Sequence, residues 1–198
     1  MLYSIYAEST PNPTAMKFVA NRRLVKNSME FKNEKEAKKL NIAQKLFAFP
    51  FIENVFISNN FISIAKNRSV EWENITMQLR EFIVDHLNKH GIENYEPKEE
   101  YINSGKETRN TKTKKDVTIK SETEKQIVQL INQYVKPAVE SDGGAIDFYS
   151  FKSGVVTVIL KGSCSGCPSS QATLKQGVER LLKDKLGDQI QSVIALNK

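Results

Sequence analysis

The chain has two cysteines, Cys164 and Cys167, and they lie three positions apart in the run GSCSGCP at residues 162–168. Two thiols at this spacing can hold one metal centre or form one disulfide. Most sites for soft metals need four ligands, and this chain supplies two thiols in one place. A metal site built on this pair is therefore half complete within one copy of the chain.

The residues around the pair suit metal ligation by thiolates. The apolar run 155–160 predicts a strand before the loop, and the periodicity of residues 169–186 predicts a helix after it. Free N–H groups at the start of a helix favour thiolate over thiol. Gly162 and Gly166 let amide groups approach sulfur, and Pro168 suits the first helical turn. We expect an exposed loop with ionised thiols.

Four kinds of site compete for a Cys-x-x-Cys pair. A thioredoxin-like redox pair needs a thioredoxin-type unit, which the expected order of elements does not match. Haem attachment needs a histidine where this chain has Pro168. Structural zinc needs two further ligands, and the two histidines, His86 and His90, lie in the other half of the chain. An iron–sulfur cluster shared between two copies supplies four thiolates by symmetry.

The elements that must position the loop form an α+β fold with two small mixed domains. In the N-terminal half we expect strands at 3–8, 16–20, 56–58 and 61–65, and helices at 34–47 and 71–90. In the C-terminal half we expect an α-β-β-α-β order: helix 124–135, disturbed by Pro137, strands 145–151 and 155–161, helix 169–186 and strand 190–196. The predicted domains are therefore residues 1–92 and 121–198.

Residues 93–120, rich in Lys, Glu, Asn and Thr, predict a flexible charged linker. The net charge of +6 is spread without a dense basic stripe, so we expect no nucleic-acid partner. No apolar run reaches the ~18 residues that span a membrane. The N-terminus shows neither a secretory signal nor a presequence pattern, which predicts a cytoplasmic protein.

The run at 162–170, with the segment 139–144 and the hairpin that precede it, resembles the C-terminal domain of NifU-type (Nfu) iron–sulfur proteins. The segment TPNP at 10–13, followed by Met16-Lys17-Phe18, resembles the Nfu N-terminal domain. Together the two resemblances cover all but the linker.

The resemblance implies a scaffold or carrier that holds a 4Fe–4S cluster and passes it to apo-proteins, with Cys164 and Cys167 as the cluster ligands. It implies a homodimer in the cluster-loaded state, an upstream cluster donor and no enzymatic reaction; a 2Fe–2S cluster stays open. Two alternatives are a thiol–disulfide oxidoreductase that uses the same pair and an interaction adaptor with a structural metal. For Asp142-Gly143-Gly144 we favour a structural turn over a functional role for Asp142.

Overall fold

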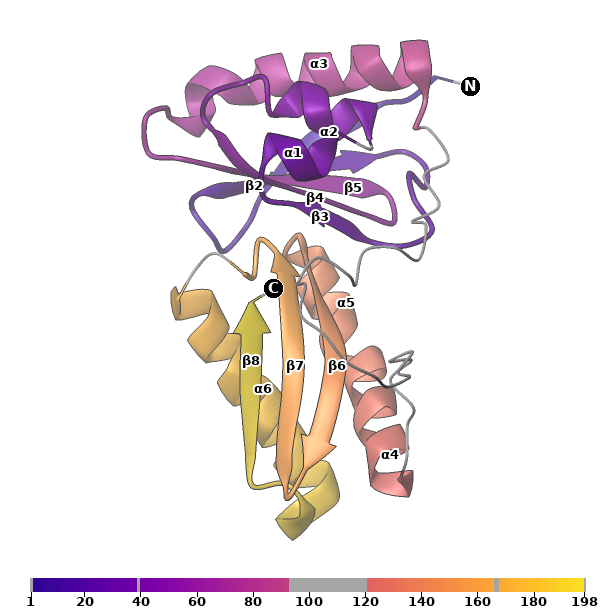
Figure 1. Cartoon of the computed structure of the whole chain (residues 1–198), viewed down its shortest axis with the longest axis vertical. Helices are drawn as coiled ribbons and strands as arrows, with labels where there is room; N and C mark the ends of the chain where they lie inside the picture. Colours follow the sequence, from indigo (N-terminus) through magenta and orange to yellow (C-terminus); the bar gives the residue numbers. More distant parts are fainter. Residues whose placement is uncertain (1, 39, 93–120, 166–167, 198) are drawn as a thin grey trace, which may run out of the picture.

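The computed structural model describes residues 2–38, 40–92, 121–165 and 168–197, which form two units, each with its own sheet and hydrophobic core (Figure 1). The α+β class is therefore confirmed. The predicted linker, residues 93–120, lies outside the described residues, and the predicted domain boundaries stay predictions. Within the described residues, no helix is long and apolar enough to cross a membrane.

The N-terminal unit is a five-stranded antiparallel sheet in the order β1-β2-β5-β4-β3. Helices α1, α2 and α3 lie on one face of the sheet, and the C-terminal unit meets the other face (Figure 1). The bounds are β1 Ile5–Ser9, β2 Ala15–Ala20, β3 Met29–Phe31, α1 Glu34–Ala37, α2 Asn41–Leu46, β4 Ile52–Ser58, β5 Phe61–Lys66 and α3 Trp72–His90.

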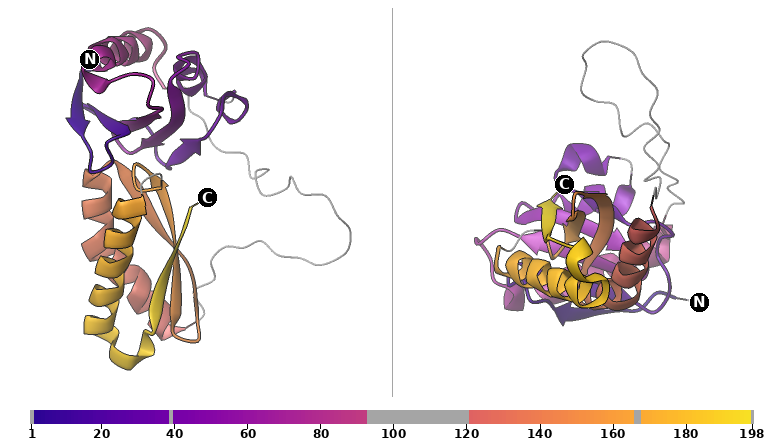
Figure 2. Two further views of the ribbon diagram at one scale, coloured as in Figure 1. Left: turned by 90° about the vertical axis from the view of Figure 1, so that its left-hand side faces the viewer. Right: turned by 90° about the horizontal axis from the view of Figure 1, so that it is seen from below.

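The C-terminal unit follows the predicted α-β-β-α-β order. A helical segment leads into a three-stranded sheet in the order β6-β7-β8, and β8 pairs parallel to β7 after the crossover through α6. The helices cover one face of this sheet (Figure 2, left). The bounds are α4 Glu122–Leu130, η2 Ile131–Val135, α5 Lys136–Ser141, β6 Gly144–Lys152, β7 Val155–Gly162, α6 Pro168–Leu186, η3 Gly187–Gln189 and β8 Ser192–Asn197.

Three local predictions need correction. The expected helix 34–47 is two short helices, because Leu40 takes an extended conformation before α2. The helix is disturbed beside Pro137, as predicted, by a π-helical stretch, but the helical segment does not end at residue 135: Pro137 lies in the first turn of α5, where a missing N–H is tolerated. The helical periodicity of residues 124–135 predicts that Tyr134 faces inward with Ile127 and Ile131, but Tyr134 is exposed because this π-helical stretch changes the helix phase.

Candidate functional site

Cys164 lies two residues after the end of β7, in the loop that leads to α6. Its sulfur takes the place where glycine at position 144 leaves room: a Cβ added to Gly144 would be 2.6 Å from Cys164 Sγ and 2.8 Å from the carbonyl oxygen of Lys161. The first residue of β6 thus leaves the space that the Cys164 sulfur occupies. Cys167, the second predicted ligand, lies outside the described residues.

The turn that ends α5 supports the same loop. Gly143 has a φ of 79°, a conformation that glycine adopts without strain. The backbone carbonyl of Asp142 accepts a hydrogen bond from the Ser163 hydroxyl, and the amide of Ser163 donates to the carbonyl of Gly143 at 3.3 Å. The structural interpretation of this turn therefore accounts for Gly143. The side chain of Asp142 remains exposed beside the loop.

The environment of Cys164 differs from the predicted exposed loop. Cys164 is buried, with 6% of its surface exposed, and Ser163 Oγ lies 3.8 Å from its sulfur. Burial raises the pKa of the Cys164 thiol, the hydrogen bond with Ser163 acts in the opposite direction, and the charge of Asp142 raises it further. The expectation of an ionised thiol was thus wrong for Cys164 in this conformation: the neutral thiol is favoured.

Residues of the other domain lie near the cysteine loop. A cavity of about 400 Å3 lies beside Cys164, and its walls come from both units. Pro11 and Asn12 belong to the loop between β1 and β2, whereas Thr173 and Leu174 belong to α6. The side-chain amide of Asn12, itself buried, donates to the carbonyl of Ser163 at 2.9 Å.

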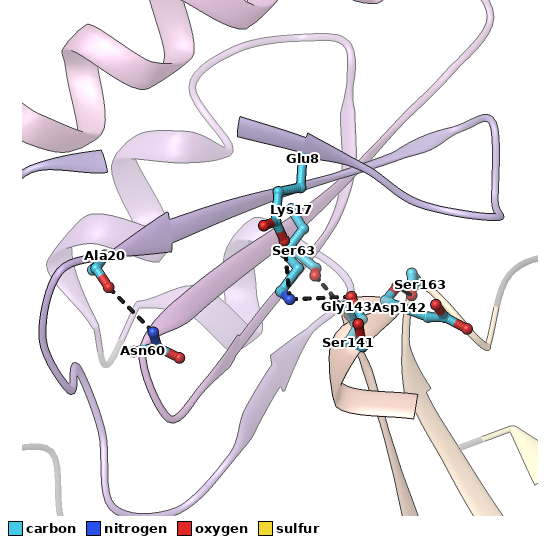
Figure 3. Close-up of polar contacts among 9 residues, drawn as sticks. All are labelled: Glu8, Lys17, Ala20, Asn60, Ser63, Ser141, Asp142, Gly143 and Ser163. Carbon is cyan, nitrogen blue, oxygen red and sulfur yellow. Dashed lines mark hydrogen bonds and ion pairs between the residues drawn. The ribbon is translucent and has the colours of Figure 1, made fainter. Parts of the chain in front are cut away.

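Further side chains of the N-terminal sheet contact backbone atoms on both sides of the cysteine loop. Lys17 Nζ donates to the carbonyl of Ser141 at 3.1 Å, and Ser63 Oγ donates to the carbonyl of Gly143 at 2.6 Å (Figure 3). Glu30 Oε1 accepts a hydrogen bond from the amide of Gly162 at 3.0 Å.

The sequence reasoning missed Asn12, Lys17, Glu30 and Ser63 as residues near the site. One signal was available, because Lys17 and Ser63 are each the single polar residue in an apolar predicted strand. The sequence did not indicate which part of the protein packs against these two residues.

The two histidines do not join this site. His86 is buried on α3 and stacks against Phe82, with ring centroids 6.1 Å apart, and His90 lies one turn further along the same helix. Their rings are 4.9 Å apart. In the described part of the chain, no group of three or more His, Cys, Asp or Glu side chains could hold a metal ion.

Comparison with known proteins identifies both units. The model for the scaffold protein Nfu/NifU N-terminal domain matches residues 5–90, and the model for the NifU-like domain matches residues 127–194. This chain belongs to the Nfu family. Each match lies within one sheet-containing unit, and the NifU-like match includes Cys164 and Cys167.

Similar proteins carry related names. The protein named NFU1 iron-sulfur cluster scaffold homolog, mitochondrial, from Drosophila sechellia is 32% identical over 181 residues, which cover 90% of this Nfu-family chain and 60% of the relative. NifU-like protein 4, mitochondrial, from Arabidopsis thaliana is 29% identical, with coverages of 90% and 61%. The chain thus spans about three fifths of the length of these relatives.

Among solved structures, the NMR structure of a NifU-like protein from Saccharomyces cerevisiae is 28% identical over 46% of this chain and 82% of that chain. Its TM-score is 0.42, too low to support a conclusion about the fold.

Proposed function

We propose that this protein is a carrier that binds an iron–sulfur cluster as cargo between two copies of the chain and passes it to apo-proteins. The observation that supports this most is the NifU-like match over residues 127–194, which places both cysteines of the chain inside that domain. The related protein of Drosophila sechellia is named an iron-sulfur cluster scaffold homolog. Two copies would supply four thiolates, the number that a 2Fe–2S or 4Fe–4S cluster takes.

We propose a 4Fe–4S cluster held by Cys164 and Cys167 from each copy. The position of Cys164 between a strand end and a helix start supports a ligand role, because neighbouring amide groups can tune a bound cluster there. An upstream protein would supply the cluster, and the carrier would catalyse no reaction of its own. We also propose that the protein is cytoplasmic, and fractionation of cells that express the native chain would test this location.

The thiol–disulfide alternative is not favoured. The domain that holds both cysteines matches the NifU-like domain, and the relative from Drosophila sechellia is named a cluster scaffold homolog rather than an oxidoreductase.

Anaerobic reconstitution with iron and sulfide tests the proposal. We expect the absorption of a 4Fe–4S cluster, about two iron atoms per chain and a mass of two chains in the coloured fraction, as sharing by two-fold symmetry requires. Cys164→Ser and Cys167→Ser should each abolish the dimer and the colour, whereas Ser165→Ala, between them, should keep both. A cluster bound by a monomer would contradict the proposal.

A further inference from the structure

One row of side chains crosses the N-terminal sheet on the face opposite its helices. The strand register aligns Glu8 with Lys17, Lys17 with Ser63, Ser63 with Phe56 and Phe56 with Glu30. Facing residues of paired strands lie on the same side of a sheet, so these five residues form one continuous line across all five strands. We call this line the docking row.

The docking row contacts the backbone that flanks the cysteine loop. Lys17 and Ser63 donate to the carbonyls of Ser141 and Gly143 (Figure 3). Glu30 accepts from the amide of Gly162. Glu8 lies at one end of the row and forms an ion pair with Lys17 at 3.2 Å.

Phe56, in the middle of the row, provides an apolar contact with the same loop. It is fully buried and clusters with Val19, Phe61 and Ala145, apart from the main core of its own domain. A Cβ on Gly162 would be 2.6 Å from the Phe56 ring, so the ring packs where glycine leaves space. The face thus combines an apolar centre with polar contacts around it, a composition typical of interfaces between units that separate.

Most polar partners on the C-terminal side are backbone atoms, at Ser141, Gly143, Gly162 and Ser163, and the Ser165 hydroxyl adds one side-chain contact to Glu30 at 3.4 Å. The N-terminal domain therefore recognises the backbone shape of the two segments that surround Cys164. We propose that the docking row, with Asn12, is a docking surface for the cysteine loop of its own chain, and that this surface must release the loop before a second copy can share a cluster there.

The second half of this proposal rests on the proposed function. In the docked state Cys164 is buried, and the walls of the cavity beside it include Pro11 and Asn12. Two docked copies would each present an N-terminal domain where their cysteine loops must meet. Docking therefore opposes dimerisation around a cluster.

Two buried lysines allow a test within one protein. Lys17 Nζ contacts the other domain, whereas Lys66 Nζ donates to the carbonyl of Val70 at 2.5 Å within its own domain. Both lysines are buried. Brief acetylation with a succinimidyl ester, followed by mass spectrometry, reports the exposure of each amine, with Lys89 on the surface as the reference for an open site.

In the cluster-free native protein we expect both Lys17 and Lys66 to react at least about tenfold more slowly than Lys89, because reaction requires opening. Asn12→Asp keeps the acceptor for the amide of Thr14 but replaces the donor to Ser163 with a charged acceptor. It should raise the rate at Lys17 about tenfold, the effect of one lost buried hydrogen bond, and leave Lys66 unchanged.

Asn60→Asp is the matched control, because the Asn60 amide donates to the carbonyl of Ala20 inside the N-terminal domain (Figure 3). It should leave Lys17 protected. Ser63→Ala is a second opening variant should Asn12→Asp not fold. Three results would each overturn the intramolecular docking. Lys17 could react as an exposed amine in the native protein, its protection could fall on dilution, or its rate could stay unchanged in both opening variants.

Loading the native protein with the cluster separates this proposal from the proposed function. We expect Lys17 to become as reactive as Lys89 in the loaded dimer, while Lys66 stays protected. A loaded dimer in which Lys17 remains protected would overturn release of the docked state. Failure to load any cluster would contradict the proposed function alone, since the cluster-free measurements decide the docking independently.

Discussion

At the scale of single residues, the position of the Cys164 sulfur depends on the absent side chain of Gly144. A methyl group there would meet both this sulfur and the backbone oxygen of Lys161, and a backbone atom cannot rotate away. We expect Gly144→Ala to lower the free energy of unfolding by about 1–3 kcal/mol, the usual cost of overpacking, in urea denaturation of the cluster-free protein.

Gly177→Ala is the control for this prediction. A Cβ at Gly177, in α6, has nothing within 4 Å. Alanine is favoured over glycine inside a helix, so this variant should gain about 0.5–1 kcal/mol. Equal effects of the two substitutions would show that the position beside Cys164 is not crowded.

The protonation of Cys164 gives a second prediction at this scale. Burial raises the pKa of the thiol, so the native state holds this proton more tightly than the unfolded chain. The resulting stability is complete below the unfolded-state pKa and is lost as the pH rises through the folded-state pKa. We therefore expect the unfolding free energy, measured under reducing conditions at increasing alkaline pH, to fall more steeply in the native protein than in Cys164→Ser. Parallel curves would contradict this.

At the scale of elements, strong local patterns predicted most of the secondary structure. The apolar runs of β2 and β5 and the apolar stripe of α3 continue over enough residues to identify each element, and Asn59 has a positive φ of 44° in the turn between β4 and β5. β3 was missed because it has three residues, too few for a period. The π-helical stretch before Pro137 was missed because a five-residue change in helical hydrogen-bond spacing leaves no distinct sequence pattern.

The start of α4 provides a prediction about one element. Ser121 caps the helix by accepting from the amide of Glu124, and the carboxylate of Glu124 accepts from the amide of Ser121 in return. Ser121→Ala should cost about 1 kcal/mol of unfolding free energy, because an N-terminal amide loses its acceptor. Ser121→Asp, which keeps an acceptor and suits the helix dipole, should cost little in the same denaturation experiment. Equal losses in both variants would exclude capping as the cause.

At the scale of the whole molecule, the sequence predicted Cys164 and Cys167 as site residues but not what covers the first of them. The hydrogen bonds of Lys17, Glu30 and Ser63 to the C-terminal domain go mainly to backbone atoms, and sequence patterns do not identify which backbone atoms a side chain will contact. Phe56 illustrates the same limit: the strand pattern places it on a face, but only the assembled fold shows that this face meets Gly162.

Phe56 and Asn12 together test whether the docked state behaves as one cooperative unit. If the domains separate, Phe56 becomes exposed on its sheet. Its truncation can then lower the unfolding free energy by no more than the free energy of docking plus a small change within the N-terminal domain. Phe56→Ala in the native background should therefore cost less than the roughly 3–5 kcal/mol typical of a buried phenylalanine in a core that stays closed. In the Asn12→Asp background, where docking is weaker, the same truncation should cost still less.

Urea denaturation of the two single variants and the double variant measures this difference. At independent sites, the effects of two substitutions on the unfolding free energy add to within about 0.5 kcal/mol. Asn12 contacts Ser163, whereas Phe56 packs against Gly162. An interaction energy well above that limit, with the double variant less destabilised than the sum, shows that both residues act through one opening of the two domains. Strict additivity would instead mean that each residue supports a local contact and that the N-terminal domain does not dock as a unit.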